Sequence, residues 1–172
     1  MRVAIAAATL VALSGPLSAQ HVHGQSPYAG FQSRQIKALA PEQLADLRAG
    51  RGMGLALAGE MNGYPGPAHV LELSDKLRLS SEQRDRIRRL FDAMKAEAIP
   101  VGEKLIEQEG ELDREFADRK ITPPKLAELT ARIGDVQGQL RAIHLKYHLT
   151  TAELLSSEQK SRYAELRGYQ KN

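Results

Sequence analysis

The stretch LSSEQ occurs twice in this chain, at Leu79–Gln83 and again at Leu155–Gln159. In each copy a serine stands three residues before a glutamine, which is the spacing of a capping box. The serine hydroxyl accepts a hydrogen bond from the amide of the glutamine, whose side chain reaches back to the amide of the serine. Each copy therefore predicts the start of a helix, with the structural caps Ser80 with Gln83 and Ser156 with Gln159.

Two long stretches between these copies repeat apolar residues at alternating steps of three and four, as a heptad pattern does. The first runs through Ile87, Phe91, Met94, Ala98, Val101, Leu105, Gln108 and Leu112, and the second through Leu126, Leu129, Ile133, Val136, Leu140, Ile143, Tyr147, Thr150 and Leu154. Thr122-Pro123-Pro124 separates them, with a capping residue followed by proline at the first helical position. The sequence predicts two helices folded back as a long antiparallel hairpin.

Shorter helices are expected around this hairpin, so the fold class is all-α. Turn residues place them at about 41–50, 53–61, 68–77 and 157–168, with a turn over 62–67. Pro100 lies inside the first long helix and should kink it. Gly134 and Gly138 on the second would either allow a close helix contact or lie on the open surface.

The N-terminal part of the chain is typical of an export signal followed by an arm. Arg2 precedes a largely apolar run from Val3 to Leu13, which is too short to span a bilayer, and Gly15-Pro16 follows it. We predict a cleaved signal peptide over 1–19 and a mobile arm over 20–38, which is rich in Gly, Ser, Pro and Gln. A single helical domain is predicted over 39–172.

Composition and motifs exclude several classes of function. The chain has no cysteine, so disulfides and thiolate sites are excluded. A net charge of +3 is too small to indicate a nucleic-acid partner. The sequence shows no nucleophile elbow, phosphate-binding glycine loop or HExxH run, so we expect no enzyme. No integral membrane segment is expected either.

The paired LSSEQ boxes around a long hairpin, in an exported chain without cysteine, resemble the periplasmic Spy/CpxP family, which carries an L-T-x-x-Q motif twice. Serine replaces threonine here at Ser80 and Ser156, which keeps the capping chemistry. The resemblance covers about residues 73–166 and implies a periplasmic, CpxP/Spy-like helical bundle that forms a homodimer.

Two functions follow from this resemblance. The first is a stress-response binding protein with ATP-independent chaperone activity, whose partners are unfolded or envelope proteins as clients, or a membrane sensor protein. The second follows from the related heavy-metal resistance and sensor proteins of the ZraP/CnrX type, which bind divalent ions through His, Glu and Met. A purely structural exported bundle is a third reading.

His144 and His148 are the strongest candidates for metal ligands. They are four residues apart on the second long helix, so both rings emerge from one face and can chelate one divalent ion, Zn, Ni, Co or Cu. We expect them to flank the apolar seam, and Glu60, Met61 or His69 to complete the site if the N-terminal helices cross that end. The alternative is a helix surface that carries two histidines by chance.

The predicted arm holds a second candidate metal site at His21 and His23. Two imidazoles near a new N-terminal amine can capture Cu(II) or Ni(II). A divalent transition metal is thus the one cofactor that these residues suggest.

The chaperone reading points instead to the basic start of the first long helix. Arg84 and Arg88 alternate there with Ile87 and Phe91, a mixture of charge and apolar surface that could bind clients. Cations near a helix N-terminus oppose its dipole, so they need a reason outside helix stability. The alternative is a solvated face whose arginines pair with acids such as Asp85.

Overall fold

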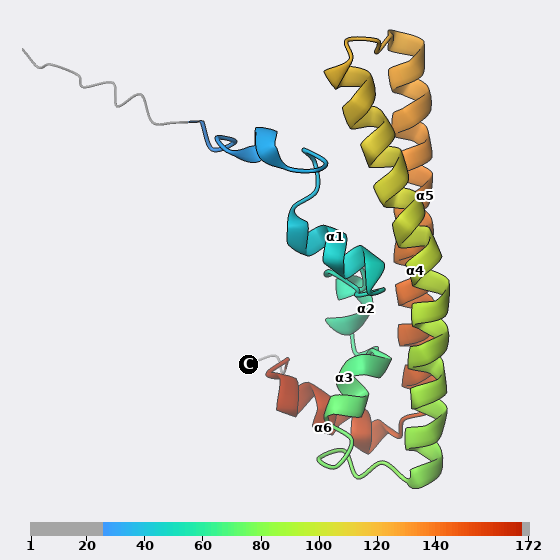
Figure 1. Ribbon diagram of the computed structural model, residues 1–172. Coiled ribbons are helices and arrows are strands. Elements are labelled where there is room, and N and C mark those ends of the chain that lie inside the picture. The colour runs from blue at the N-terminus through green and yellow to red at the C-terminus, as the bar shows by residue number, and fades with distance from the viewer. Residues whose placement is uncertain (1–25, 170–172) are drawn as a thin grey trace, which may run out of the picture.

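A computed structural model describes residues 26–169, and within this range every regular element is a helix. Helices α4 (Ser81–Ala117) and α5 (Pro123–Glu153) form the long antiparallel hairpin seen in Figure 1. The all-α prediction is confirmed. In the described part of the chain, no helix is both long and apolar enough to cross a membrane. The predicted signal peptide, His21 and His23 lie outside the described residues.

The remaining helices are short and lie along one side of the hairpin (Figure 1). They are η1 (Phe31–Ser33), α1 (Pro41–Arg48), α2 (Leu57–Glu60), α3 (Pro67–Glu72) and α6 (Ser157–Arg167). Helix α2 begins at Leu57 and not at Met53, because Met53 and Gly54 have φ values of 43° and 79° that a right-handed helix cannot contain. Helix α3 ends at Glu72, and turns connect it to Leu79.

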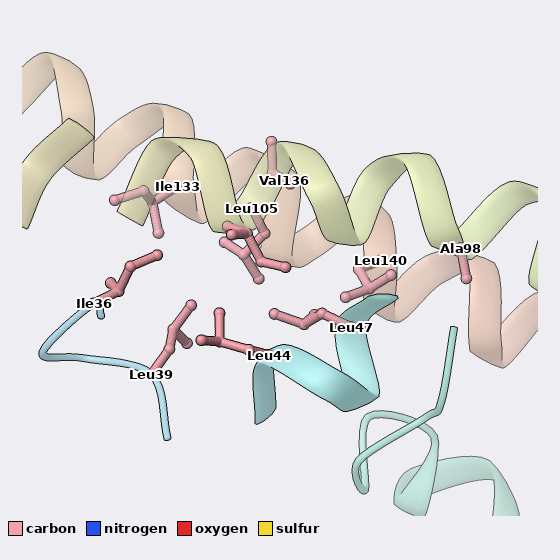
Figure 2. Close-up of a cluster of buried hydrophobic side chains, with 10 residues drawn as sticks. Ile36, Leu39, Leu44, Leu47, Ala98, Leu105, Ile133, Val136 and Leu140 are labelled. Carbon is pink, nitrogen blue, oxygen red and sulfur yellow. The ribbon is translucent and has the colours of Figure 1, made fainter. Parts of the chain in front are cut away.

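Two apolar clusters attach these helices to the hairpin. In Figure 2, Leu44 and Leu47 of α1 point toward Leu105 and Leu140, while Ile36 points toward Ile133. Ile36 is only 5% exposed and belongs to this first cluster. The second cluster lies at the other end of the short-helix layer and gathers Val70, Leu77, Leu79, Ile87, Leu155 and Tyr163.

The buried face of the hairpin is wider than a heptad seam because α1 and the 52–57 segment cover its flank. Gly102 and His144, which lie beside the predicted seam, are buried. Thr151 is buried in place of Thr150, which is only partly covered. Leu126 is 38% exposed, because the short helices do not reach the turn end of the hairpin (Figure 1).

The proline and glycines of the long helices fall into different environments. Helix α4 continues through Pro100, which is exposed, and its axis bends near its middle (Figure 1). At Gly134 and Gly138 an added Cβ would meet nothing within 4 Å, so they lie on the open surface. At Gly102 an added Cβ would lie 2.6 Å from the carbonyl oxygen of Leu47, where α1 crosses α4.

Both predicted capping boxes are present, one at the start of α4 and one at the start of α6. The amide of Gln83 donates to Ser80 Oγ at 3.1 Å and that of Gln159 donates to Ser156 Oγ at 3.1 Å. In return, the amides of Ser80 and Ser156 donate to the side-chain oxygens of their glutamines, at 3.1 and 2.9 Å. The first turn of each helix is thus closed locally.

The two boxes also bind each other. Gln83 Nε2 donates to Gln159 Oε1 at 2.9 Å, and Gln159 Nε2 donates to Gln83 Oε1 at 3.1 Å. The same nitrogens donate to the backbone carbonyls of Leu154 and Leu77, at 2.8 and 3.3 Å. The repeated motif therefore joins the start of α4 to the α5–α6 turn.

Replacing Gln83 by alanine should destabilise the fold more than replacing Gln43. Gln43 accepts from the amide of Ala40 at 2.9 Å, so it caps α1 locally but has no such partner on another helix. We expect Gln83→Ala to lower the free energy of unfolding by about 1–3 kcal/mol, and Gln43→Ala by under about 1 kcal/mol. Urea unfolding measures both variants. The double variant Gln83→Ala/Gln159→Ala should lose less free energy of unfolding than the sum of the losses in the two single variants. Strictly additive losses would contradict the pairing.

Replacing Gly134 and Gly102 by alanine should change the free energy of unfolding in opposite directions. Gly134→Ala should raise the free energy of unfolding by about 0.5–1 kcal/mol, because alanine is the better helix former and its Cβ meets open space. Gly102→Ala should lower it, because the new Cβ would collide with the Leu47 carbonyl. Thermal or urea unfolding of both variants checks this, and stabilisation by Gly102→Ala would refute the close contact of α1 with α4.

Candidate metal centre

A cavity of about 300 Å³ lies where α2, α3, α5 and the end of α6 meet. Its walls carry three of the five histidines, one buried glutamate and two methionines. These side chains are His69, His144, His148, Glu60, Met53 and Met94. The cavity is therefore the place where the described chain concentrates groups that bind transition metals.

His144 forms the floor of this cavity. His144 is only 2% exposed, and its Nε2 has no hydrogen-bond partner among the described residues. Burial, together with the neighbouring His148, lowers the pKa of His144. The imidazole is therefore neutral at neutral pH, so Nε2 can offer a lone pair to a metal ion.

His148 lies one turn further along α5, with its ring fixed from two sides. Its Nδ1 lies 2.7 Å from the carbonyl oxygen of Tyr64, so this nitrogen carries the proton and donates it to the carbonyl. The other nitrogen, Nε2, faces Gly66, where an added Cβ would come within 2.5 Å of it. The tautomer with a free Nε2 is the one that a metal ligand requires.

Glu60 supplies a buried carboxylate on the opposite wall. The residue is 5% exposed, and its Oε2 accepts from the amide of Gly66 at 3.3 Å. Its Oε1 accepts a short hydrogen bond from the hydroxyl of Tyr163 and a longer one, 3.3 Å, from that of Tyr169. Both carboxylate oxygens are thus held by groups that lie far apart in the sequence.

Two histidines also approach this carboxylate. His69 Nδ1 lies 3.6 Å from Oε1 and His148 Nδ1 lies 3.6 Å from Oε2. Burial raises the pKa of Glu60, but hydrogen bonds from His69 and Tyr163, the charge of His69 and the Gly66 amide outweigh it, and the pKa falls to about 2. Glu60 is therefore an anion throughout the physiological pH range.

The structure brings together most of the ligands that the sequence suggested. Glu60 and His69 lie at the same cavity as His144 and His148, whereas Met61 is 51% exposed and does not line it. His144 does not flank the seam as predicted but lies buried in the hairpin, because Gly52 and its neighbours cover it. Sequence reasoning did not single out Met94, since its position in the heptad pattern marked it as a core residue.

The chemical types of the ligands in this cavity suit a divalent transition metal. Neutral imidazoles, a carboxylate and nearby thioethers are the ligands that Zn, Ni, Co and Cu accept. In the described part of the chain, no three His, Asp or Glu side chains already stand in a coordinating arrangement. His69 has a side chain 39% exposed at the cavity rim, so it has room to rotate toward an ion. The residues thus match a transition-metal ion in the types of ligand they offer.

The predicted client-binding residues differ in exposure, and Arg84 and Arg88 are the exposed ones. Ile87 is fully buried in the cluster with Leu155 and Tyr163, so its assignment as a client contact is wrong. Phe91 is half-buried against the bundle, and Arg84 pairs with Asp75 at 2.9 Å. The packing of α3 and α6 over this part of α4 is the reason, because it covers the apolar positions.

Glu60 predicts an acid-dependent loss of stability. Its pKa is about 2 in the folded protein and near 4.5 when unfolded, so its stabilising effect is complete above pH 4.5 and disappears as the pH falls toward 2. The loss should be on the order of 3 kcal/mol. Glu60→Gln should remove this pH dependence, whereas Glu97→Gln, which alters an exposed carboxylate bonded to Tyr147, should leave most of it. Urea unfolding at pH 6, 4 and 3 tests this, and identical pH slopes in wild type and Glu60→Gln would contradict it.

Comparison with known proteins gives one family match. A family model described as heavy-metal resistance matches residues 52–162, a range that holds both LSSEQ copies, Glu60, His69, His144 and His148. Searches of curated proteins and of solved structures gave no significant match. The matched range covers well over half of the chain, and it supports the heavy-metal part of the resemblance seen in the sequence. The chain therefore belongs to the heavy-metal resistance family.

Proposed function

We propose that this protein binds a divalent transition-metal ion in the cavity between α2, α3 and α5 and serves in heavy-metal sensing or resistance. One observation carries the proposal: the buried Nε2 of His144 has no partner among the described residues and lies one helical turn from His148. Buried polar atoms are normally satisfied, so an unpartnered imidazole nitrogen beside a cavity indicates a ligand. Membership of the heavy-metal resistance family supports the same conclusion.

Each residue has a distinct role in this proposal. His144 and His148 supply the two imidazole nitrogens from one rigid helix, at the spacing that chelates a single ion. Glu60 supplies negative charge that offsets the charge of the ion. His69 closes the site from the rim, and Met94 adds a polarisable thioether to the wall. The ion is cargo or signal, and the protein acts as a binding protein.

The cellular setting completes the proposal. A signal peptide over 1–19 would deliver the protein to the periplasm, where His21 and His23 of the arm form a second, separate capture site for Cu(II) or Ni(II). A homodimer and a membrane sensor protein as partner follow from the Spy/CpxP resemblance.

Chaperone activity is the other function that this resemblance implies, and the structure favours it less. Of the four residues assigned to clients, Ile87 is buried and Arg84 is paired with Asp75. Suppression of aggregation of a denatured client, without ATP and at several-fold molar excess, would restore the chaperone proposal.

Calorimetric titration tests the metal site. The candidate metal ligands of the arm are first removed by His21→Ala and His23→Ala. Zn(II), Ni(II), Co(II) and Cu(II) are then titrated separately. We expect one site per chain for at least one ion, with a Kd below roughly 0.1 mM, or about −5.5 kcal/mol. His144→Ala and His148→Ala should each weaken binding at least about tenfold, because each removes a direct ligand.

Lys146→Ala is the matched control for this titration. Lys146 lies on α5 between the two histidines, but its ammonium faces Glu97 at 2.6 Å and it does not line the cavity. Its replacement should leave the Kd unchanged within about twofold. Binding that survives the loss of both α5 histidines would place the metal elsewhere and defeat the proposal.

A further inference from the structure

Tyr163 of α6 and Tyr169 beyond its end both bind the carboxylate of Glu60, which lines the cavity. Tyr163 is 2% exposed and packs in the cluster that holds Val70, Ile87 and Leu155, while its hydroxyl extends to Glu60 Oε1. Just beyond the end of the helix, Tyr169 donates to the same oxygen at 3.3 Å. Two hydroxyls from the C-terminal part of the chain therefore converge on one oxygen of a carboxylate in α2.

These hydroxyls determine how the carboxylate is turned. With Oε1 occupied by Tyr163 and Tyr169, Oε2 is directed toward the Gly66 amide and the ring of His148. An ionised carboxylate accepts about four hydrogen bonds, so it keeps acceptor capacity for a metal ion on this side. Without the hydroxyl of Tyr163, rotation of the carboxylate would no longer be restricted in this way.

The hydroxyl of Tyr163 does not need a charged partner in order to be satisfied. Removing an ionised carboxylate from water is costly, and a tyrosine in an apolar cluster can hydrogen-bond a neutral carbonyl instead. Here the partner is an anion at the edge of the histidine cavity. Arg167 Nε also lies 3.9 Å from Oε1, so the charge contributes to the fold, while its place at the cavity makes it available to an ion.

We propose that Tyr163 is a positioning residue of the metal centre: its hydroxyl, assisted by Tyr169, holds the Glu60 carboxylate toward His69 and His148. Helix α6 is then a working part of the site although it supplies no ligand. Hydrogen bonds to a ligating carboxylate commonly change metal affinity by 10–100-fold when they are removed. This inference rests on the proposed metal function.

By reciprocity, a bound ion must also strengthen the attachment of α6. If the attached helix improves metal affinity by a given factor, the metal improves attachment of the helix by the same factor. Amide hydrogen exchange over residues 157–167 should therefore slow when metal is added. The effect should require the hydroxyl of Tyr163.

Tyr163→Phe tests the proposal, with Tyr147→Phe as its matched control. Tyr147 is 6% exposed and also donates its hydroxyl to a carboxylate, Glu97 Oε1 at 2.7 Å, but Glu97, unlike Glu60, does not line the cavity. Both changes remove one oxygen and keep the ring. In protein lacking the arm histidines, Tyr163→Phe should raise the Kd at least about tenfold and abolish the slowing of exchange in α6. Tyr147→Phe should change neither by more than about twofold.

A second, spectroscopic measurement separates positioning from structure. The chain has five tyrosines and no tryptophan, and Zn(II) has a filled d shell, so a Zn(II)-induced change in near-ultraviolet absorbance reports mainly on tyrosines. We expect such a change in wild type and in Tyr147→Phe, and a much smaller one in Tyr163→Phe. If Tyr163→Phe lowers the melting temperature of the metal-free protein but leaves the Kd and the absorbance change intact, Tyr163 is structural only and the proposal fails.

Other outcomes distinguish the two levels of inference. Metal binding that depends on His144 but not on Tyr163 overturns the positioning role and leaves the metal site in place. Absence of any His144-dependent binding overturns both. Should Tyr163→Phe not fold, Tyr169→Phe replaces it, with a smaller loss of affinity expected because the hydroxyl of Tyr169 is further from Glu60. An unchanged Kd in that variant would overturn the proposal.

Discussion

The mutual hydrogen bonding of Gln83 and Gln159 is the constraint on which the rest of the structure depends. A capping box normally serves its own helix, and here each glutamine also satisfies a backbone carbonyl beside the other box. The start of α4 is thereby fixed to the turn that ends α5, so α6 returns along the hairpin next to α3. As a result, Tyr163 packs in the same cluster as Val70, and its hydroxyl donates to Glu60.

The candidate metal centre is assembled from two distant parts of the chain, α2 with α3 and α5 with α6. Helix α5 provides two histidines at a fixed spacing, α2 provides the carboxylate, α3 provides His69, and the C-terminal part provides the tyrosines. Burial works against the charge of Glu60, and several donors together keep it ionised. The arrangement gathers one buried anion and three histidines around a small cavity, with Arg167 Nε 3.9 Å from the same carboxylate.

Local signals in the sequence were sufficient for the fold. Heptad steps and capping chemistry depend on neighbouring residues, so they predicted the long hairpin and the starts of α4 and α6. The pairing of the two boxes and the cover over His144 depend on tertiary contacts that no local pattern encodes. Helix α2 is shorter than predicted because Met53, not only a glycine, adopts positive φ. Ile87 shows a conflict within the prediction, since a seam residue cannot also be a client contact.

Gly66 has a consequence for the thermodynamics of the proposed site. Because Gly66 has no side chain, the ring of His148 lies directly against its backbone. On the other edge of the ring, Nδ1 donates to the carbonyl of Tyr64. The side-chain conformational entropy of His148 is thus lost when the chain folds, and not when an ion binds. His69 at the exposed rim lies 3.6 Å from Glu60 Oε1, so an ion would have to replace this contact, and that rearrangement should limit how tightly the centre holds its cargo.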